Sequence, residues 1–390
     1  MIPYGKHNAT LPDALKVAWQ IRFHSLTQGS KIAQFEEAVS KYVGAKYAVA
    51  VSSATAGLHI AMLALDLPQN SKVITSPISF VASSNSVLYA GHRPIFIDID
   101  RDTLNLDPEL VANEVSIDPE VRAMIPVHFA GLPCDMESLS KTARKYSLHI
   151  IEDAAHALGA TYENGDKVGS CTYSDMTVFS FHPVKSITTG EGGMVTTNSI
   201  ELYKKLLRLR SHGINKLDDQ FENTILSKTA GVTNLWYYEM TELGFNYRLT
   251  EIQAVLGINQ LARLDKFISK REDRASRYKH LITKNKMFAP AQNCDTRKSA
   301  NHIYPLRMKF SSSNLSRNQL MHALKSKGVG TQVHYIPIPV QPFYQALGHE
   351  ISEIPEAFSY YEEALTIPLF PGLKLRQQKF IIKLIDDLMK

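Results

Sequence analysis

The sequence predicts an α/β protein with a parallel or mostly parallel central sheet, covered by helices on both faces, and a smaller α+β domain after it. Between about residues 45 and 200, short β-rich runs alternate with helix-like segments. Near residue 250 this alternation gives way to a long helical stretch. A chain of 390 residues also exceeds the usual length of one domain, so we expect two.

The expected strands are short apolar runs rich in Val, Ile and Thr. They are Tyr47–Val51, Lys72–Thr75, Arg93–Ile97, Ala123–His128, Leu148–Glu152, Met176–Phe181 and Met194–Thr197. Helical segments fall between most of them, for example over residues 56–67 and 136–146. In an open sheet of this kind, ligands bind outside the carboxyl ends of the strands. We therefore expect functional side chains directly after these runs.

A capping box at Thr250-Glu-Ile-Gln253 predicts the start of a helix, which we expect to continue to Lys279. Ile252, Val255 and Leu256 share one face of that helix, with Asn259 as its polar exception. We place the domain boundary near residue 260, with a large domain and amino-terminal arm over 1–260 and a small domain over 261–390. The small domain is expected to contain extended runs at Ile303–Met308 and Gly330–Tyr335 and helices near 316–327 and 376–389. Residues 214–235 show no interpretable pattern.

Composition excludes several classes of protein. The chain is 44% hydrophobic and 21% charged, and its net charge of +5 is spread without Lys or Arg runs. This charge suits a small anionic substrate and is too weak to indicate nucleic acid. Cys134, Cys171 and Cys294 have neither metal-binding nor redox spacing, so we expect no metal and a reduced, cytoplasmic protein. No signal peptide or apolar stretch of about 18 residues occurs, so no membrane partner is expected.

The most informative residues are Asp153 and Lys185, each at the end of an apolar run. A lysine amine can form a Schiff base with the aldehyde of pyridoxal 5′-phosphate (PLP), and a carboxylate can keep the pyridine nitrogen of PLP protonated. Alone, the lysine is equally consistent with a solvated surface charge and the aspartate with a helix cap. Together, on neighbouring strand ends, they predict PLP chemistry.

A phosphate site is expected at Ser53, Ala54 and Thr55, where a strand turns into a helix. Free amides and the positive end of the helix dipole favour an anion there, although a plain Ser/Thr cap explains the same residues. Ser180 is a candidate for a further phosphate hydroxyl. The glycine-rich fingerprints of nucleotide-binding loops are absent from the sequence, which disfavours a nicotinamide-dependent oxidoreductase.

Two further side chains follow strand ends. Phe80 is a candidate for stacking on a cofactor ring, and a core position is the alternative. His156 is a candidate for supporting the Asp153 carboxylate, and a structural histidine is equally compatible with the sequence.

Five segments, taken together, resemble the DegT/StrS-type nucleotide-sugar aminotransferases. They are Ser52-Ser-Ala-Thr-Ala-Gly-Leu58, Ser76-Pro-Ile-Ser-Phe-Val-Ala82, Glu152-Asp-Ala-Ala-His-Ala-Leu-Gly159, Phe179-Ser-Phe-His-Pro-Val-Lys-Ser-Ile-Thr-Thr-Gly-Glu-Gly-Gly193 and Gly244-Phe-Asn-Tyr-Arg-Leu-Thr-Glu-Ile-Gln253. The resemblance spans nearly the whole chain. It implies the fold type I (aspartate aminotransferase) architecture, PLP as cofactor and a homodimer with active sites at the subunit interface.

The resemblance also implies a role for each candidate. Lys185 matches the Schiff-base lysine, which favours transamination over the dehydration catalysed by family members with histidine there. Asp153 matches the partner of the pyridine nitrogen, and Phe80 the ring-stacking aromatic. The phosphate cradle is matched by Ser53, Ala54, Thr55 and Ser180. His156 matches a position beside the cofactor. Asn246 matches a phosphate ligand that comes from the neighbouring subunit.

Three segments narrow the expected substrate, because they resemble the pseudaminic acid branch of this family. They are Ser211-His-Gly-Ile with the insert leading to Asn246, Asn301-His-Ile-Tyr304 and Gln332-Val-His-Tyr-Ile-Pro-Ile-Pro339. The implied reaction is amination by glutamate at carbon 4 of UDP-2-acetamido-2,6-dideoxy-β-L-arabino-hex-4-ulose. The substrate contacts implied are Tyr4, His334 and Tyr335. The alternatives are a 4-aminotransferase of perosamine, aminoarabinose or bacillosamine type, and a PLP-binding regulator without turnover.

Overall fold

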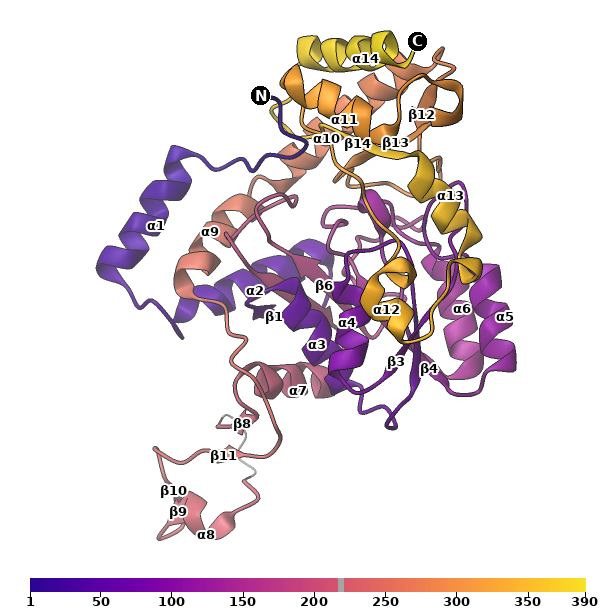
Figure 1. Cartoon of the computed structure of the whole chain (residues 1–390). Coiled ribbons are helices and arrows are strands. Elements are labelled where there is room, and N and C mark those ends of the chain that lie inside the picture. Colours follow the sequence, from indigo (N-terminus) through magenta and orange to yellow (C-terminus); the bar gives the residue numbers. More distant parts are fainter. Residues whose placement is uncertain (217–220) are drawn as a thin grey trace.

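The computed structural model describes residues 1–216 and 221–390 (Figure 1). Its main sheet has seven strands in the order β1-β7-β6-β5-β4-β2-β3. The strands are β1 Tyr47–Val51, β2 Lys72–Thr75, β3 Arg93–Phe96, β4 Val121–Ile125, β5 His149–Asp153, β6 Met176–Ser180 and β7 Gly193–Thr197. β7 runs antiparallel to both of its neighbours, and the other pairs are parallel. The predicted mostly parallel sheet is confirmed.

Helices pack on both faces of this sheet. One face is covered by α2 Ser30–Val43, α5 Pro108–Ile117 and α6 Met136–Tyr146, and the other by α3 Ala54–Ala64, α4 Ala82–Tyr89 and α7 Ile200–Arg210. In β1, Ala48 and Ala50 join the first cluster while Val49 and Val51 join the second. This alternation places neighbouring residues of each strand in different layers.

The capping box at Thr250 is present. The Thr250 Oγ1 accepts a hydrogen bond from the Gln253 amide at 3.3 Å, and the Gln253 Oε1 accepts one from the Thr250 amide at 3.0 Å. The expected continuous helix is wrong, because α9 Glu251–Leu261 ends before α10 Leu264–Ile282 begins. Arg263, between them, has non-helical backbone angles, and its guanidinium binds the Asp13 carboxylate at 2.6 Å.

Of the residues predicted to share one face of α9, Val255 is buried. Ile252, Leu256 and Asn259 are only partly buried, whereas Glu251 is fully buried. The Glu251 carboxylate accepts three backbone amides at the start of α2, at 2.8 to 3.2 Å. Apolar periodicity misses this face because its key member is a carboxylate that caps another helix.

The carboxyl-terminal part has a separate three-stranded antiparallel sheet of β12 Phe288–Pro290, β13 Tyr304–Met308 and β14 Ala364–Ile367. Its helices are α11 Arg317–Ser326, α12 Pro342–Ala346, α13 Pro355–Glu363 and α14 Leu375–Met389. Short 3₁₀ helices lie at Phe129–Gly131, Phe310–Ser312, Ile338–Val340 and Ile351–Glu353. The extended run expected at Gly330–Tyr335 is not a strand, since it makes a single bridge, Gln332 to Thr366. The boundary near residue 260 stays a prediction.

Arg271 of α10 ties this part to the rest of the chain. Its side chain is 1% exposed, and its Nη1 donates to the carbonyl oxygens of Asn301, His302 and Leu369 at 3.3, 2.9 and 3.0 Å. The Asn301–His302 segment also packs on Gly131, whose φ is +100°. A Cβ at Gly131 would lie 3.1 Å from the amide nitrogens of Asn301 and His302. Arg271 and Gly131 thus fix the Asn301–His302 segment.

Two segments project from the body in Figure 1. One is α1 Leu11–Phe23, which packs on α9. The other, called the arm, comprises residues 214–216 and 221–243, with β8 Ile214–Asn215, α8 Thr224–Ser227, β9 Lys228–Thr229, β10 Val232–Thr233 and β11 Glu239–Met240. Residues 217–220 of the region without a pattern lie outside the described residues. Both segments expose large apolar side chains: Leu11, Leu15, Trp19, Phe23, Leu235, Trp236 and Leu243.

In the part of the chain described, no helix has both the length and the apolar character needed to cross a bilayer.

Candidate active site

Asp153 is the last residue of β5, at the carboxyl end of the sheet. It pairs with Val178 of the parallel strand β6, and its side chain is buried. Its Oδ2 accepts a hydrogen bond from the Ser83 Oγ of α4 at 2.6 Å, and its Oδ1 accepts one from the Ala155 amide at 3.1 Å. These donors hold the carboxylate in one orientation.

Lys185 follows the end of β6 in a turn closed by its own amide, which donates to the His182 carbonyl at 2.9 Å. Burial lowers the pKa of the Lys185 amine from 10.5 to about 8, and the negative charge of Asp153 opposes this effect. The two side chains therefore lie within electrostatic range, as the sequence predicted. An amine with this pKa is partly neutral, and hence nucleophilic, near neutral pH.

Ser53 is the N-cap of α3, as the alternative of a simple Ser/Thr helix cap predicts. Its Oγ accepts from the Ala56 amide at 3.1 Å and its carbonyl from the Gly57 amide at 3.0 Å. The amides of Ala54 and Thr55 have no protein acceptor among the residues described, so two N–H groups at the helix start remain free for an anion. The cap and the anion site are thus compatible.

Gly193 keeps this helix start open. It faces Ser180 across the β6–β7 pair, and a Cβ on Gly193 would lie 2.7 Å from the Ala54 nitrogen and the Ser53 carbonyl carbon. The glycine therefore allows β7 to approach the helix start closely. Ser180 lies beside the same opening, at the end of β6.

Phe80 is 61% exposed in this single chain, so it does not belong to the core. It precedes α4, whose Ser83 holds Asp153. The exposure favours the stacking interpretation over the core interpretation.

His156 does not support the Asp153 carboxylate, because its Nε2 pairs with the Tyr335 hydroxyl at 3.2 Å. Its Nδ1 is buried and has no partner among the residues described. Burial first, and then the positive charge of Lys185, hold the pKa of His156 well below 6.5. The imidazole is therefore neutral and presents one free ring nitrogen.

The three predicted substrate residues lie next to this histidine. The Tyr4 and His334 ring centroids are 5.7 Å apart, and the His334 Nδ1 pairs with the Thr366 hydroxyl at 2.9 Å. Burial, and then Lys185, lower the pKa of His334 to about 4, and burial raises the pKa of Tyr335. The structure thus brings Tyr4, His334 and Tyr335 to the Lys185 site, with His334 and Tyr335 uncharged.

Asn246 is not joined to Lys185 or Asp153 by any contact among the described residues. It bridges Ser211 at the base of the arm, and its neighbour Tyr247 accepts a hydrogen bond from the Ser52 amide at 2.8 Å. A contribution to a second subunit's phosphate site stays a prediction.

Sequence reasoning missed Ser83 and His302. Ser83 is identified only by tertiary packing, although its hydroxyl also lies 2.7 Å from that of Ser79 in the loop before α4. His302 packs against His156 with ring centroids 4.4 Å apart and ring planes tilted by 42°. Its segment carries no local signal for that contact.

The residues present fit PLP. Two free amides at a helix start suit the phosphate, the buried Asp153 suits a ring N–H, and the Lys185 amine suits an aldehyde. The free Nδ1 of His156 is a further polar contact for the cofactor. Fold and site together define a fold type I, PLP-dependent aminotransferase.

Comparison with known proteins specifies the family. Residues 12–386 match the model of the DegT/DnrJ/EryC1/StrS aminotransferase family, and the chain belongs to that family. It is 38% identical over 381 residues to the UDP-4-amino-4,6-dideoxy-N-acetyl-beta-L-altrosamine transaminase of Campylobacter jejuni serotype O:23/36, covering 98% of this chain and 96% of the relative.

Solved structures agree with this assignment. Helicobacter pylori PseC, an aminotransferase of pseudaminic acid biosynthesis, superposes with a TM-score of 0.90 at 32% identity, covering 100% of this chain and 99% of that one. The sugar aminotransferase Spr1654 of Streptococcus pneumoniae, in its PMP form, gives a TM-score of 0.89 at 28% identity, covering 100% and 99%. A PLP form of Spr1654 is also known.

Proposed function

We propose that this enzyme transfers the amino group of glutamate to carbon 4 of a UDP-linked 4-keto-6-deoxy-N-acetylhexosamine, in pseudaminic acid biosynthesis. The observation that carries the aminotransferase chemistry is the Lys185–Asp153 pair at neighbouring strand ends. The sugar is supported by the likeness to the Campylobacter jejuni protein, whose name specifies a UDP-linked 4-amino-4,6-dideoxy-N-acetyl sugar. The pathway is supported by the likeness to the Helicobacter pylori aminotransferase.

PLP, when bound, supplies a ring that accepts electrons from the carbon bearing the amino group. Lys185 Nζ, partly neutral because its pKa is about 8, is the base placed to take and return the proton of that carbon. General acid–base transfer of this kind contributes about 10²- to 10⁴-fold to the rate.

Asp153 keeps its position because Ser83 and the Ala155 amide occupy one oxygen each. Every carboxylate oxygen has two acceptor directions, so both retain one for the ring N–H. A carboxylate fixed in this way needs no reorganisation when positive charge is held on the ring.

The neutral polar groups around Lys185 suit a sugar. His156, His334 and Tyr335 carry no charge at neutral pH, and they offer hydrogen-bonding atoms for hydroxyl, keto or acetamido groups. A charged histidine here would instead oppose protonation of Lys185.

We infer that the active enzyme is a cytoplasmic homodimer in which Asn246 completes the partner's phosphate site. α1 and the arm expose large apolar side chains, among them Trp19 and Trp236. Burial of these side chains against a second copy of the chain would explain their exposure in a single chain. Mixing Lys185→Ala with Asn246→Ala subunits should restore part of the activity, because one of the two hybrid sites is intact. Absence of rescue would contradict shared sites.

The substrate is tested with a panel of UDP-, dTDP- and GDP-4-keto sugars plus glutamate, followed by mass analysis of the products. We expect preferential amination of the UDP-linked N-acetyl sugar. Preference for a GDP- or dTDP-linked sugar would support a perosamine-type or related 4-aminotransferase instead. Lack of turnover with every sugar, despite PLP binding, would support a regulator.

A further inference from the structure

Glu152 is a fully buried carboxylate directly beside Asp153 in β5. Successive side chains of a strand point to opposite faces, so Glu152 lies behind the sheet when viewed from the cofactor site. Ile150 and Ile151, its predecessors, belong to the two opposite core layers in the same alternation. Burial of an isolated carboxylate is costly, so its surroundings require an explanation.

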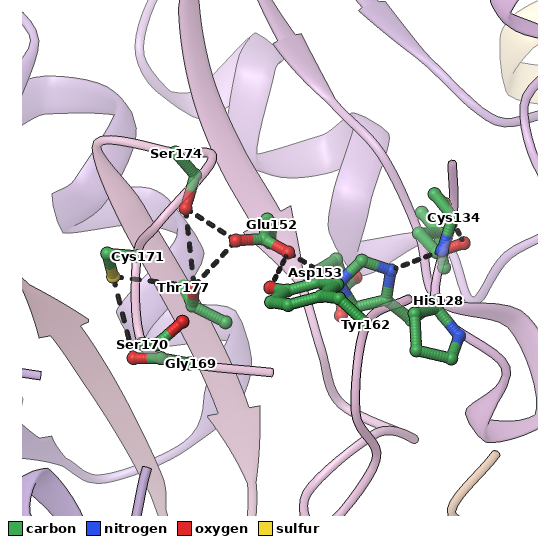
Figure 2. Close-up of polar contacts among 12 residues, drawn as sticks. His128, Cys134, Glu152, Asp153, Tyr162, Gly169, Ser170, Cys171, Ser174 and Thr177 are labelled. Carbon is green, nitrogen blue, oxygen red and sulfur yellow. Dashed lines mark hydrogen bonds and ion pairs between the residues drawn. The ribbon is translucent and has the colours of Figure 1, made fainter. Parts of the chain in front are cut away.

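Four donors converge on this carboxylate (Figure 2). The His128 Nε2 and the Tyr162 hydroxyl contact Oε2 at 2.7 and 2.5 Å. The Ser174 and Thr177 hydroxyls contact Oε1 at 2.5 and 3.0 Å. Both oxygens are saturated, as the ionised form requires. Although burial raises the pKa of Glu152, these hydrogen bonds, led by that of His128, lower it below its ordinary value.

His128 does not neutralise this charge. Its Nδ1 accepts a hydrogen bond from the Cys134 amide at 3.1 Å, so Nδ1 holds a lone pair and the ring proton is on Nε2, facing Glu152. Against the effect of burial, the Cys134 side chain and then the Glu152 carboxylate raise the pKa of His128 to about 10, but the geometry at Nδ1 decides its protonation state. A second proton on the ring would have to be on Nδ1, where it would clash with the hydrogen of the Cys134 amide.

The other titratable groups facing Glu152 are also neutral. Burial, and then Glu152, raise the pKa of the Tyr162 phenol. Burial raises that of the Cys171 thiol to about 12, with Glu152 adding to it. The Cys134 thiol donates to the Val127 carbonyl. Within residues 1–216 and 221–390, no lysine or arginine forms an ion pair with Glu152. With His128 held in its neutral form by the Cys134 amide, no described side chain in contact with Glu152 carries a compensating positive charge.

We propose that ionised Glu152 acts as a remote second carboxylate for the cofactor site, where its charge strengthens the hold on the proton shared by Asp153 and the pyridine nitrogen of PLP. From strand geometry the two carboxylates are roughly 8–10 Å apart, within range of a little-screened interaction. Glu152 does not touch the cofactor, so it is a positioning residue. The inference rests on PLP use and is independent of the sugar.

The test compares holoenzyme carrying ¹⁵N-labelled PLP in wild type, Glu152→Gln and Tyr162→Phe. Glu152→Gln keeps the shape and removes the charge, whereas Tyr162→Phe removes one donor and keeps the charge. The ¹⁵N chemical shift of the pyridine nitrogen is followed upward in pH as far as the enzyme retains its cofactor. We expect Glu152→Gln to lose the proton about one pH unit below wild type, a tenfold weaker hold, and Tyr162→Phe to follow wild type.

Coincident curves for wild type and Glu152→Gln would overturn the proposal, even if both stay protonated throughout. Equal shifts in both variants would also overturn it, because they would indicate loss of packing. If Glu152→Gln does not fold, infrared spectra of ¹³C-glutamate-labelled wild type decide the matter. A protonated carboxyl band at neutral pH refutes the ionised state, and its absence supports it. Failure with every sugar would leave these readouts unaffected.

Discussion

The pH dependence of cofactor attachment follows from the environment of Lys185. At pH 7 an amine of pKa 10.5 is neutral in roughly one molecule in 3,000, whereas an amine of pKa about 8 is neutral in about one in ten. The structure therefore raises the reactive fraction about 300-fold at that pH. We expect the rate of covalent PLP attachment by the apoenzyme to rise about tenfold per pH unit and to level off above about 8.

The assay mixes apoenzyme with PLP across a pH series and follows the visible absorption of the lysine-linked cofactor. Borohydride trapping and peptide mass analysis assign the site, with Lys185→Ala as the blank. Asp153→Asn should move the midpoint downward, because the Asp153 charge raises the pKa of Lys185. A midpoint near 10.5 in wild type would refute the argument that burial activates this amine.

Three other predictions concern stability, cofactor affinity and turnover. Since the folded-state pKa of Lys185 is depressed from 10.5 to about 8, a penalty of about 3 kcal/mol is present below pH 8 and disappears as the pH approaches 10.5. Lys185→Met should raise the apoenzyme's free energy of unfolding in urea by that amount at neutral pH only, and an equal gain at high pH would contradict this. Gly193→Ala should weaken PLP binding at least about tenfold in a fluorescence titration through its clash with Ser53, whereas Gly372→Ala, whose nearest neighbour is 3.7 Å away, should not. Ser83→Ala should lower kcat about tenfold at saturating PLP by freeing the Asp153 carboxylate, and unchanged kcat would exclude that role.

Local patterns were sufficient for the sheet, the capping box at Thr250 and the Lys185–Asp153 pair, because each depends on residues adjacent in sequence. They failed where a polar side chain acts across the fold. The Glu251 carboxylate caps α2, and Arg263 lies outside both α9 and α10 and binds Asp13. Side-chain partners of this kind are set by tertiary packing, which periodicity does not encode.

The site shows the same limit. The position of Asp153 followed from the end of a strand, but its Ser83 donor comes from a helix 70 residues away. His156 was a candidate to support Asp153 or a structural histidine, and the structure pairs its Nε2 with Tyr335, far along the chain. Strand ends predict where candidate residues lie, and only the packed structure identifies their hydrogen-bond partners.

The buried guanidinium of Arg271 has an evolutionary consequence. All its acceptors are main-chain oxygens, which every amino acid supplies, so substitution at Leu369 leaves that hydrogen bond available. Arg271 itself is constrained, because a shorter or uncharged side chain would leave the three carbonyl oxygens without their hydrogen-bond donor. Among homologues, position 271 should therefore tolerate far less drift than position 369.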